Sequence, residues 1–105
     1  MIDKLSNVEA QYVDLMTRLG TTEVQSDQTE YRKAAKALSE LEPLVQKYRE
    51  YKAVQKDIED AEGIVAGVDA DMRELAQEEL KDLHAKRDVI VAALQVLLVP
   101  KDPND

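Results

Sequence analysis

The chain has 105 residues, of which 44% are hydrophobic and 34% are charged, and it contains no Cys, Trp or Phe. This length forms one domain at most, and the lack of cysteine excludes a disulfide scaffold, a thiol nucleophile and a cysteine-ligated metal. The net charge of −8 would repel a phosphate backbone, which argues against direct binding of DNA or RNA by charge neutralisation.

The apolar stretches of the chain are too short to cross a bilayer. The longest uninterrupted one, residues 89–94, has six residues, whereas a membrane-spanning helix needs about 20. Residues 1–10 include Asp3, Glu9 and a single lysine, so they resemble neither a secretory signal nor an organellar transit peptide. We therefore expect a cytoplasmic protein with no membrane partner.

The first predicted element is a helix over residues 2–19, with Gly20 as its left-handed C-cap. Its apolar residues recur every three or four positions and form one stripe: Leu5, Val8, Tyr12, Leu15, Met16 and Leu19. Residues 21–26, which follow, are polar or β-branched and show no periodicity.

The second predicted helix begins after an N-cap at Ser26 or Asp27, and Glu30 stands three residues beyond Asp27 as in a capping box. It runs to about residue 66, roughly 40 residues or about 60 Å. Its apolar stripe consists of Tyr31, Ala34, Leu38, Leu41, Val45, Tyr48, Tyr51, Val54, Ile58, Ala61 and Val65. On this stripe the tyrosines are expected to pack in the core or at its rim rather than to stack on bases.

Pro43 argues against reading residues 27–66 as one uninterrupted helix, because it lacks the amide N–H that would bond to the Ser39 carbonyl. The alternative is a break, with Pro43 opening a new helix. That alternative needs an N-cap at Glu42, a residue that caps poorly. Since the apolar stripe continues through the proline in register, we favour one kinked helix.

The third predicted helix follows a turn marked by Gly63 and Gly67, and Asp69 or Asp71 can cap it. It ends near residues 99–100. Its stripe is nearly a heptad seam: Met72, Ala76, Leu80, Leu83, Arg87, Ile90, Leu94 and Leu97.

Two long helices joined by a short turn lie antiparallel, and the first helix must bury its stripe against them. The predicted fold is all-α, an elongated three-helix bundle with a long antiparallel, coiled-coil-like hairpin.

Charge is distributed unevenly along this predicted hairpin. Residues 57–82 hold ten acidic and two basic residues, a net charge of −8, whereas residues 31–56 hold seven basic and three acidic residues. The acidic stretch surrounds the predicted turn, so one end of the hairpin is expected to be strongly negative.

The residues that could support chemistry do not converge. His84 is the only histidine, which leaves no metal cluster and no Ser–His pair, and the residue three positions before it is Lys81 rather than the Glu of a di-iron motif. The paired carboxylates Glu78–Glu79 and Glu59–Asp60 are adjacent in sequence, so on a helix they point apart. The three glycines are isolated and form no phosphate loop. We expect a helical interaction domain that is not an enzyme and binds no metal or cofactor.

Four segments carry a resemblance to a known family: residues 40–45 (ELEPLV), 48–52 (YREYK), 71–80 (DMRELAQEEL) and 97–105 (LLVPKDPND). In this order they resemble the N-terminal domain of the bacterial release factor 1 family, the class I peptide chain release factors that read UAA and UAG. The resemblance implies a role in translation termination. The Gly-Gly-Gln loop and the Pro-x-Thr codon-reading segment of that family are not present in these 105 residues. The resemblance therefore implies an N-terminal helical domain over residues 1–99, with residues 100–105 beginning a linker to absent catalytic and decoding domains.

The family resemblance also implies a partner, the stalk base or GTPase-associated region of the large ribosomal subunit. It further implies an interaction with the recycling release-factor GTPase. We expect the acidic end of the hairpin to face a basic protein surface there through five residues: Glu59, Glu62, Asp69, Asp71 and Glu74. The plainer interpretation is that these acids are only solvated and keep the protein soluble. Self-association of the isolated domain through apolar surface is a further expectation. The rival function is an independent helical adaptor or chaperone-like coiled-coil protein.

Overall fold

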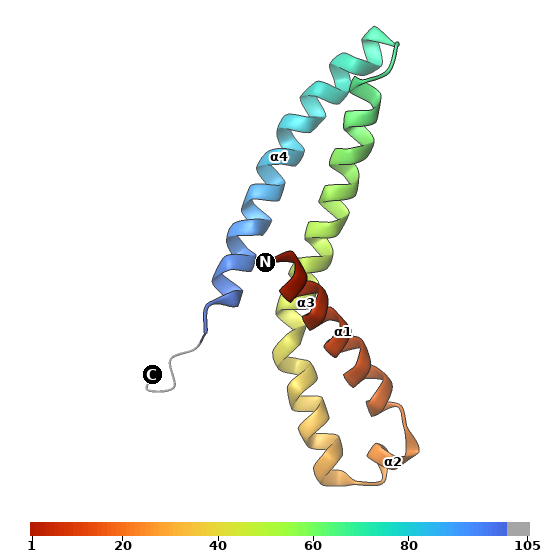
Figure 1. Cartoon of the computed structure of the whole chain (residues 1–105), viewed down its shortest axis with the longest axis vertical. Coiled ribbons are helices and arrows are strands. Elements are labelled where there is room, and N and C mark those ends of the chain that lie inside the picture. Colours follow the sequence, from red (N-terminus) through yellow and green to blue (C-terminus); the bar gives the residue numbers. More distant parts are fainter. Residues whose placement is uncertain (101–105) are drawn as a thin grey trace. The chain divides into compact units, whose positions relative to one another are not determined.

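The computed structural model describes residues 1–100, and every regular element among them is a helix (Figure 1). The helices are α1 (Ile2–Leu19), α2 (Thr22–Gln25), α3 (Gln28–Val65) and α4 (Ala70–Leu98). The chain divides into two compact units, one comprising Met1–Gln46 and one beginning at Lys47. The all-α prediction is confirmed over the described residues. None of their helices combines the length and the apolarity that crossing a bilayer requires.

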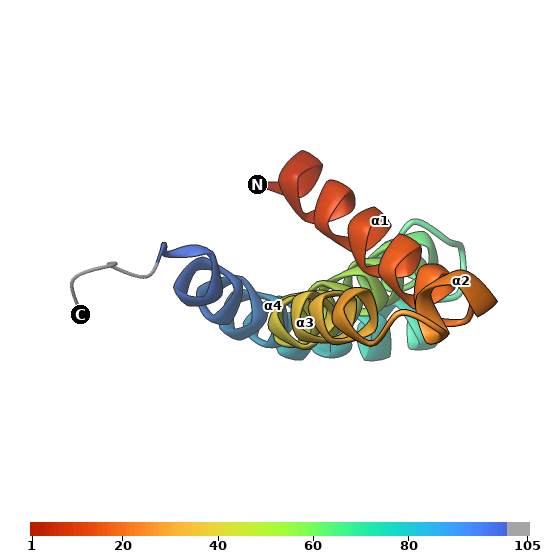
Figure 2. The same ribbon diagram turned by 90° about the horizontal axis from the view of Figure 1, so that it is seen from below.

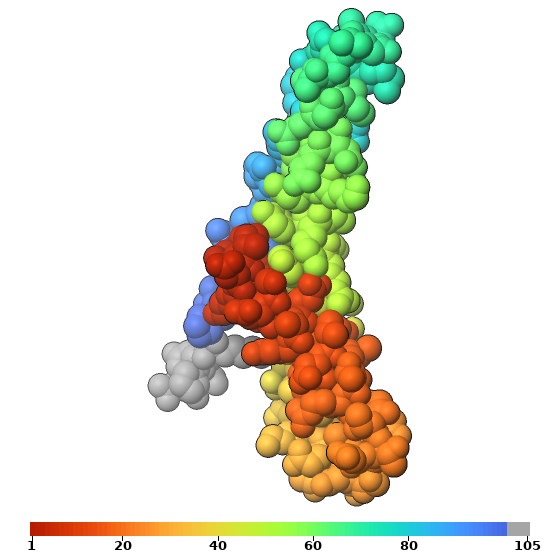
Figure 3. Space-filling view, turned by 45° about the vertical axis from the view of Figure 1, so that its right-hand side comes forward, coloured from red at the N-terminus to blue at the C-terminus, as the bar shows by residue number. Residues whose placement is uncertain are grey.

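In the first unit, α1 and the N-terminal part of α3 run in opposite directions and are linked through α2 (Figures 1 and 3). The bounds of α1 are those predicted from the stripe of apolar residues. Leu5 is buried and most of the stripe is half-buried, but Met16 is exposed. Met16 is adjacent to Leu15, so it lies about 100° around the helix from the centre of the stripe.

The prediction of a left-handed Gly20 is wrong. Gly20 has φ −86° and ψ −3°, and its N–H donates to the Thr17 carbonyl at 3.1 Å. The chain thus leaves α1 through a tight right-handed turn and enters α2, a helix that the missing periodicity did not indicate. Thr21 caps α2, since its Oγ1 accepts from the Val24 N–H at 3.3 Å. A threonine followed by Glu23 in the first turn was the signal for this helix.

The start of α3 decides between the two candidate caps. Asp27 Oδ1 accepts from the Glu30 N–H at 3.2 Å, so Asp27 is the N-cap. Ser26 instead closes α2, donating its hydroxyl to the Thr22 carbonyl at 2.6 Å. Only half of the predicted capping box forms, because the Asp27 N–H is already donated to the Val24 carbonyl.

Pro43 lies inside α3, which continues through it without interruption for 38 residues in all. The single-helix prediction is confirmed and the alternative break is wrong. The boundary between the two compact units falls within this helix, one turn after the proline.

The second unit is a helical hairpin in which the remainder of α3 and α4 lie side by side and antiparallel (Figures 1 and 2). Asp69 caps α4, as predicted, because its Oδ1 accepts from the N–H groups of Asp71 and Met72 at 3.0 and 3.2 Å. Arg73 closes the turn by donating from Nη2 to the Gly67 carbonyl at 2.7 Å. The predicted hairpin is confirmed.

The core follows the predicted stripes of α3 and α4. Its buried members there are Ala34, Val45, Tyr48, Val54, Ile58, Ala61, Ala76, Leu83, Ile90 and Leu94. Tyr31, Met72 and Leu97 were placed on the same stripes but are exposed, because each lies near a helix end where the facing helix offers fewer neighbours. Of the predicted linker 100–105, residues 101–105 lie outside the described residues.

Candidate functional site

The acidic tip, defined as residues 57–82, comprises the last turns of α3, the connecting turn and the first turns of α4 (green to cyan in Figures 1 and 3). It holds the ten acidic and two basic residues counted from the sequence. The five residues predicted to contact a partner all lie in the tip and all are exposed: Glu59, Glu62, Asp69, Asp71 and Glu74.

Two of these acids have a local structural reason for their position. Asp69 is the N-cap of α4 and Asp71 is in its first turn, where the partial positive charge of the helix N-terminus favours a carboxylate. Glu74 lies just beyond that turn. Glu59 and Glu62 have no such reason, because they stand in the last two turns of α3, where the helix dipole favours cations.

The basic residues in and beside the tip do not neutralise these acids. Lys56 pairs with Asp60 at 3.3 Å and Lys81 with Glu78 at 3.5 Å, both at exposed positions where ion pairs are weak. Arg73 donates to a backbone carbonyl. Within residues 1–100, no cation approaches the side chains of Glu59, Glu62, Asp71 or Glu74 within ion-pair distance. The tip is therefore a negative surface that the described part of the chain leaves uncompensated.

Other candidate groups remain apart. His84 is exposed on α4. Across residues 1–100, no three histidine or carboxylate side chains gather in a way that could hold a metal ion. The adjacent carboxylates lie on exposed helix faces, where Glu78 and Asp60 make the surface ion pairs described above.

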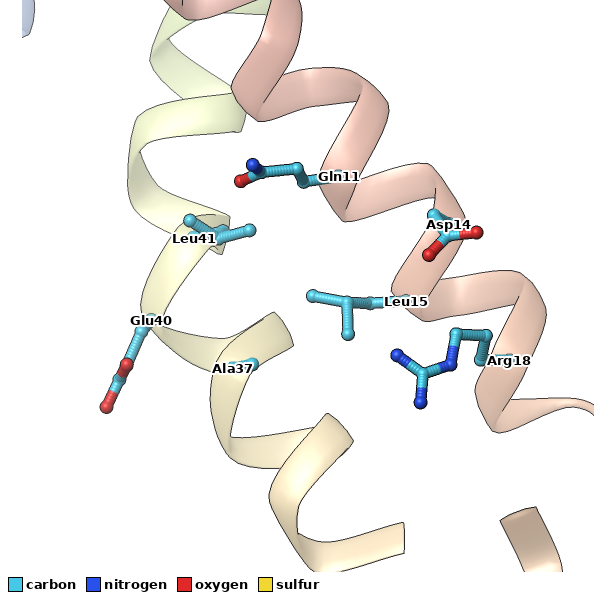
Figure 4. A pocket seen from close by; sticks show the side chains of 7 residues that line it. All are labelled: Gln11, Asp14, Leu15, Arg18, Ala37, Glu40 and Leu41. Carbon is cyan, nitrogen blue, oxygen red and sulfur yellow. The ribbon is translucent and has the colours of Figure 1, made fainter. Parts of the chain in front are cut away.

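A groove between α1 and α3 in the first unit was not indicated by the sequence (Figure 4). Its volume is about 370 Å³, and Leu15, Ala37 and Leu41 form its apolar part. Its other lining residues are Gln11, Asp14, Arg18 and Glu40. Figure 4 shows Leu15 directed toward α3, whereas Glu40 points away from α1. The small Ala37 opposite Leu15 leaves the space, and the charged groups do not converge on one point as an active site would require.

Comparisons with known proteins agree on one family. The family model for the PCRF domain matches residues 8–105. The chain is 45% identical over 106 residues to peptide chain release factor 1 of Carboxydothermus hydrogenoformans, covering 100% of this chain and 30% of that protein. It is 42% identical over 105 residues to peptide chain release factor 1 of Acidobacterium capsulatum, and 41% identical over 107 residues to peptide chain release factor 1 of Alkaliphilus oremlandii. Both alignments cover 100% of this chain, and they cover 29% of the Acidobacterium protein and 30% of the Alkaliphilus protein. No solved structure matches.

The chain thus spans about 30% of the length of the curated relatives it matches. The resemblance found in residues 40–45, 48–52, 71–80 and 97–105 is confirmed by these full-chain alignments. Because the family model covers almost the whole sequence, the chain belongs to the PCRF domain family, the domain found in peptide chain release factor 1.

Proposed function

We propose that the chain is the N-terminal, non-catalytic domain of a cytoplasmic class I release factor that terminates translation at UAA and UAG codons. The names of its relatives and the 30% share of their length that it covers support this proposal. In it, residues 1–99 form the domain and residue 100 begins the linker. Peptidyl-tRNA hydrolysis and codon reading belong to other parts of such a factor.

The role of the domain is to dock the factor on the ribosome through the acidic tip. The observation that carries this role is the exposed, uncompensated set of carboxylates, above all Glu59 and Glu62. These two acids oppose the dipole of α3, so the stability of the helix does not account for them. A residue that lowers the stability of its own helix in this way is typical of a residue retained for recognition.

The chemistry of the tip indicates the kind of surface it meets. A cluster of carboxylates repels the phosphates of ribosomal RNA and attracts lysine- and arginine-rich protein. The proposed partner is therefore a basic protein surface. The family resemblance implies that this surface belongs to the stalk base of the large ribosomal subunit, with the recycling release-factor GTPase as a second partner. Long-range attraction of this type mainly raises the association rate and weakens as salt is added.

The test is a charge reversal in a full-length release factor that carries this domain. The variant combines Glu59→Lys, Glu62→Lys and Glu74→Lys and leaves the Asp69 cap intact. We expect its association rate with ribosomes stopped at UAA to fall at least about tenfold at low salt, and the loss to shrink at high salt. Stopped-flow binding measures the rate, and a peptide-release assay at saturating factor checks that the chemistry is preserved.

A matched control carries Asp14→Lys, Glu23→Lys and Glu42→Lys, which change the net charge equally at exposed positions outside the tip. It should keep the association rate near that of the unmodified factor. Unchanged rates for the tip variant at both salt concentrations, or equal losses in the two variants, would mean that the tip is only solvated.

A further inference from the structure

Four large apolar side chains are exposed within the acidic tip. Val68 in the connecting turn is 100% exposed, and Leu75 on α4 is 67% exposed. Ile64 near the end of α3 and Met72 in the first turn of α4 are also exposed. We call these four residues the tip patch. An exposed apolar surface bordered by polar groups commonly marks the place where another protein binds.

The fold does not account for Val68 and Leu75. The neighbours of Val68 build the turn, since the Gly67 carbonyl accepts a hydrogen bond and Asp69 caps α4. Valine has no polar group that could bond to the backbone of a turn, and this valine is fully exposed. Leu75 lies outside the core, to which α4 contributes the adjacent Ala76 instead. A polar residue at either position is therefore compatible with the fold.

The members of the patch that belong to helices lie on one side of the hairpin. Leu75 precedes Lys86 by eleven residues, so their directions around α4 differ by only about 20°. Ile64 follows Asp57 by seven residues and lies within about 20° of it around α3. Lys86 and Asp57 line the same groove between α3 and α4. Ile64 and Leu75 therefore border the same side of the hairpin, and Met72 adjoins Leu75 three positions along α4.

Carboxylates surround the patch. The positions three or four residues from Leu75 on the surface of α4 include three exposed acids: Asp71, Glu78 and Glu79. Asp60 stands four residues before Ile64 on α3, and Asp69 follows Val68 in the turn. A partner that covers the patch must place positive charge opposite these acids, because a carboxylate buried without a counter-charge is strongly destabilising. An apolar centre with a polar rim is also the usual anatomy of an interface between proteins.

We propose that the tip patch anchors the docked partner, and that the partner is a protein surface whose apolar side chains are bordered by lysine and arginine. This inference rests on the docking function proposed above and divides it between two sets of residues. The carboxylates attract the partner and act mainly on the association rate. The patch leaves water on docking and acts mainly on the dissociation rate. RNA does not fit this surface, because its phosphates would face the acids.

The test is a double variant of a full-length release factor that carries this domain, Val68→Ser with Leu75→Gln. Neither substitution changes the charge, and circular dichroism verifies that the variant remains helical. We expect the dissociation rate from ribosomes stopped at UAA to rise at least about tenfold, because two apolar side chains no longer leave water on docking. The association rate should change little, and the effect on dissociation should persist at high salt. Stopped-flow binding measures association, and a chase with excess unlabelled factor measures dissociation.

The matched control is Val13→Ser with Met16→Gln, two exposed positions on α1 outside the tip, which should leave both rates unchanged. An unchanged dissociation rate for the patch variant, or equal increases in the two variants, would overturn the anchor. In that case a slower association of the charge-reversal variant would still support docking through the tip. If neither the patch variant nor the charge-reversal variant changes a rate, docking through the tip fails as well.

Photo-cross-linking tests the class of partner. A benzophenone cross-linker in place of the fully exposed Val68 leaves the core of the hairpin untouched. Illumination of this factor on a ribosome stopped at UAA should join the tip to a ribosomal protein. A cross-link to ribosomal RNA alone, or to another part of the same factor, would overturn the proposed partner.

Discussion

At the scale of single residues, the turn between α3 and α4 depends on side chains that bond to the backbone. Asp69 accepts two of the amide protons that the start of α4 leaves without helical partners, and Arg73 donates to the Gly67 carbonyl. Both residues belong to the acidic tip, yet their contacts are structural. The tip therefore contains two kinds of charged residue, those that build the turn and those that face outward.

Asp69→Ala should separate these roles. Loss of the cap is expected to lower the free energy of unfolding by about 1 kcal/mol, because the two amides lose their acceptor. Asp69→Asn removes the same charge but keeps an oxygen acceptor, so it should retain most of the stability. Urea unfolding followed by circular dichroism measures both variants. Equal losses in the two would assign the stabilisation to the charge rather than to the cap.

At the scale of elements, the long helices could be predicted because their stripes repeat over many turns. Residues such as Val45, Ile58 and Leu83 are buried where the pattern placed them. Short connections offer no such repetition. Gly20 suits a left-handed cap, but the chain continues into α2 and needs no reversal there. The conformation of Gly20 depends on the helix that follows it, and the local sequence pattern does not show that helix.

Pro43 gives the element-scale prediction. Within α3 it lacks the N–H that would bond to the Ser39 carbonyl, and a helix-interior proline costs up to about 3 kcal/mol relative to alanine. Pro43→Ala should therefore stabilise the chain and raise its thermal midpoint.

The control for this substitution is Glu42→Ala, an adjacent exposed position in the same helix that keeps the proline. It should change the midpoint little. A lower midpoint for Pro43→Ala would indicate instead that packing on either side of the proline depends on the bend that a proline introduces.

At the scale of the whole molecule, charge is segregated along the chain. The negative charge concentrates in residues 57–82, whereas residues 89–98, at the other end of the helix that begins in the tip, carry no charge. Counting charges by segment was enough to find the tip. The groove beside Leu15 and the exposure of Val96 could not be found this way, because both depend on which helix faces which.

This segregation predicts how salt affects stability. Ten carboxylates within one hairpin end repel each other over distances comparable to the Debye length, about 10 Å at 0.1 M salt. Added salt should therefore raise the thermal midpoint. The double variant Glu59→Gln with Glu62→Gln should raise the free energy of unfolding at low salt by up to about 0.5 kcal/mol per charge, and with it the thermal midpoint. It should also reduce the gain from salt. Asp14→Asn with Glu42→Gln removes the same charge outside the tip and should do neither. If both pairs behave alike, net charge rather than its concentration at the hairpin end governs the response.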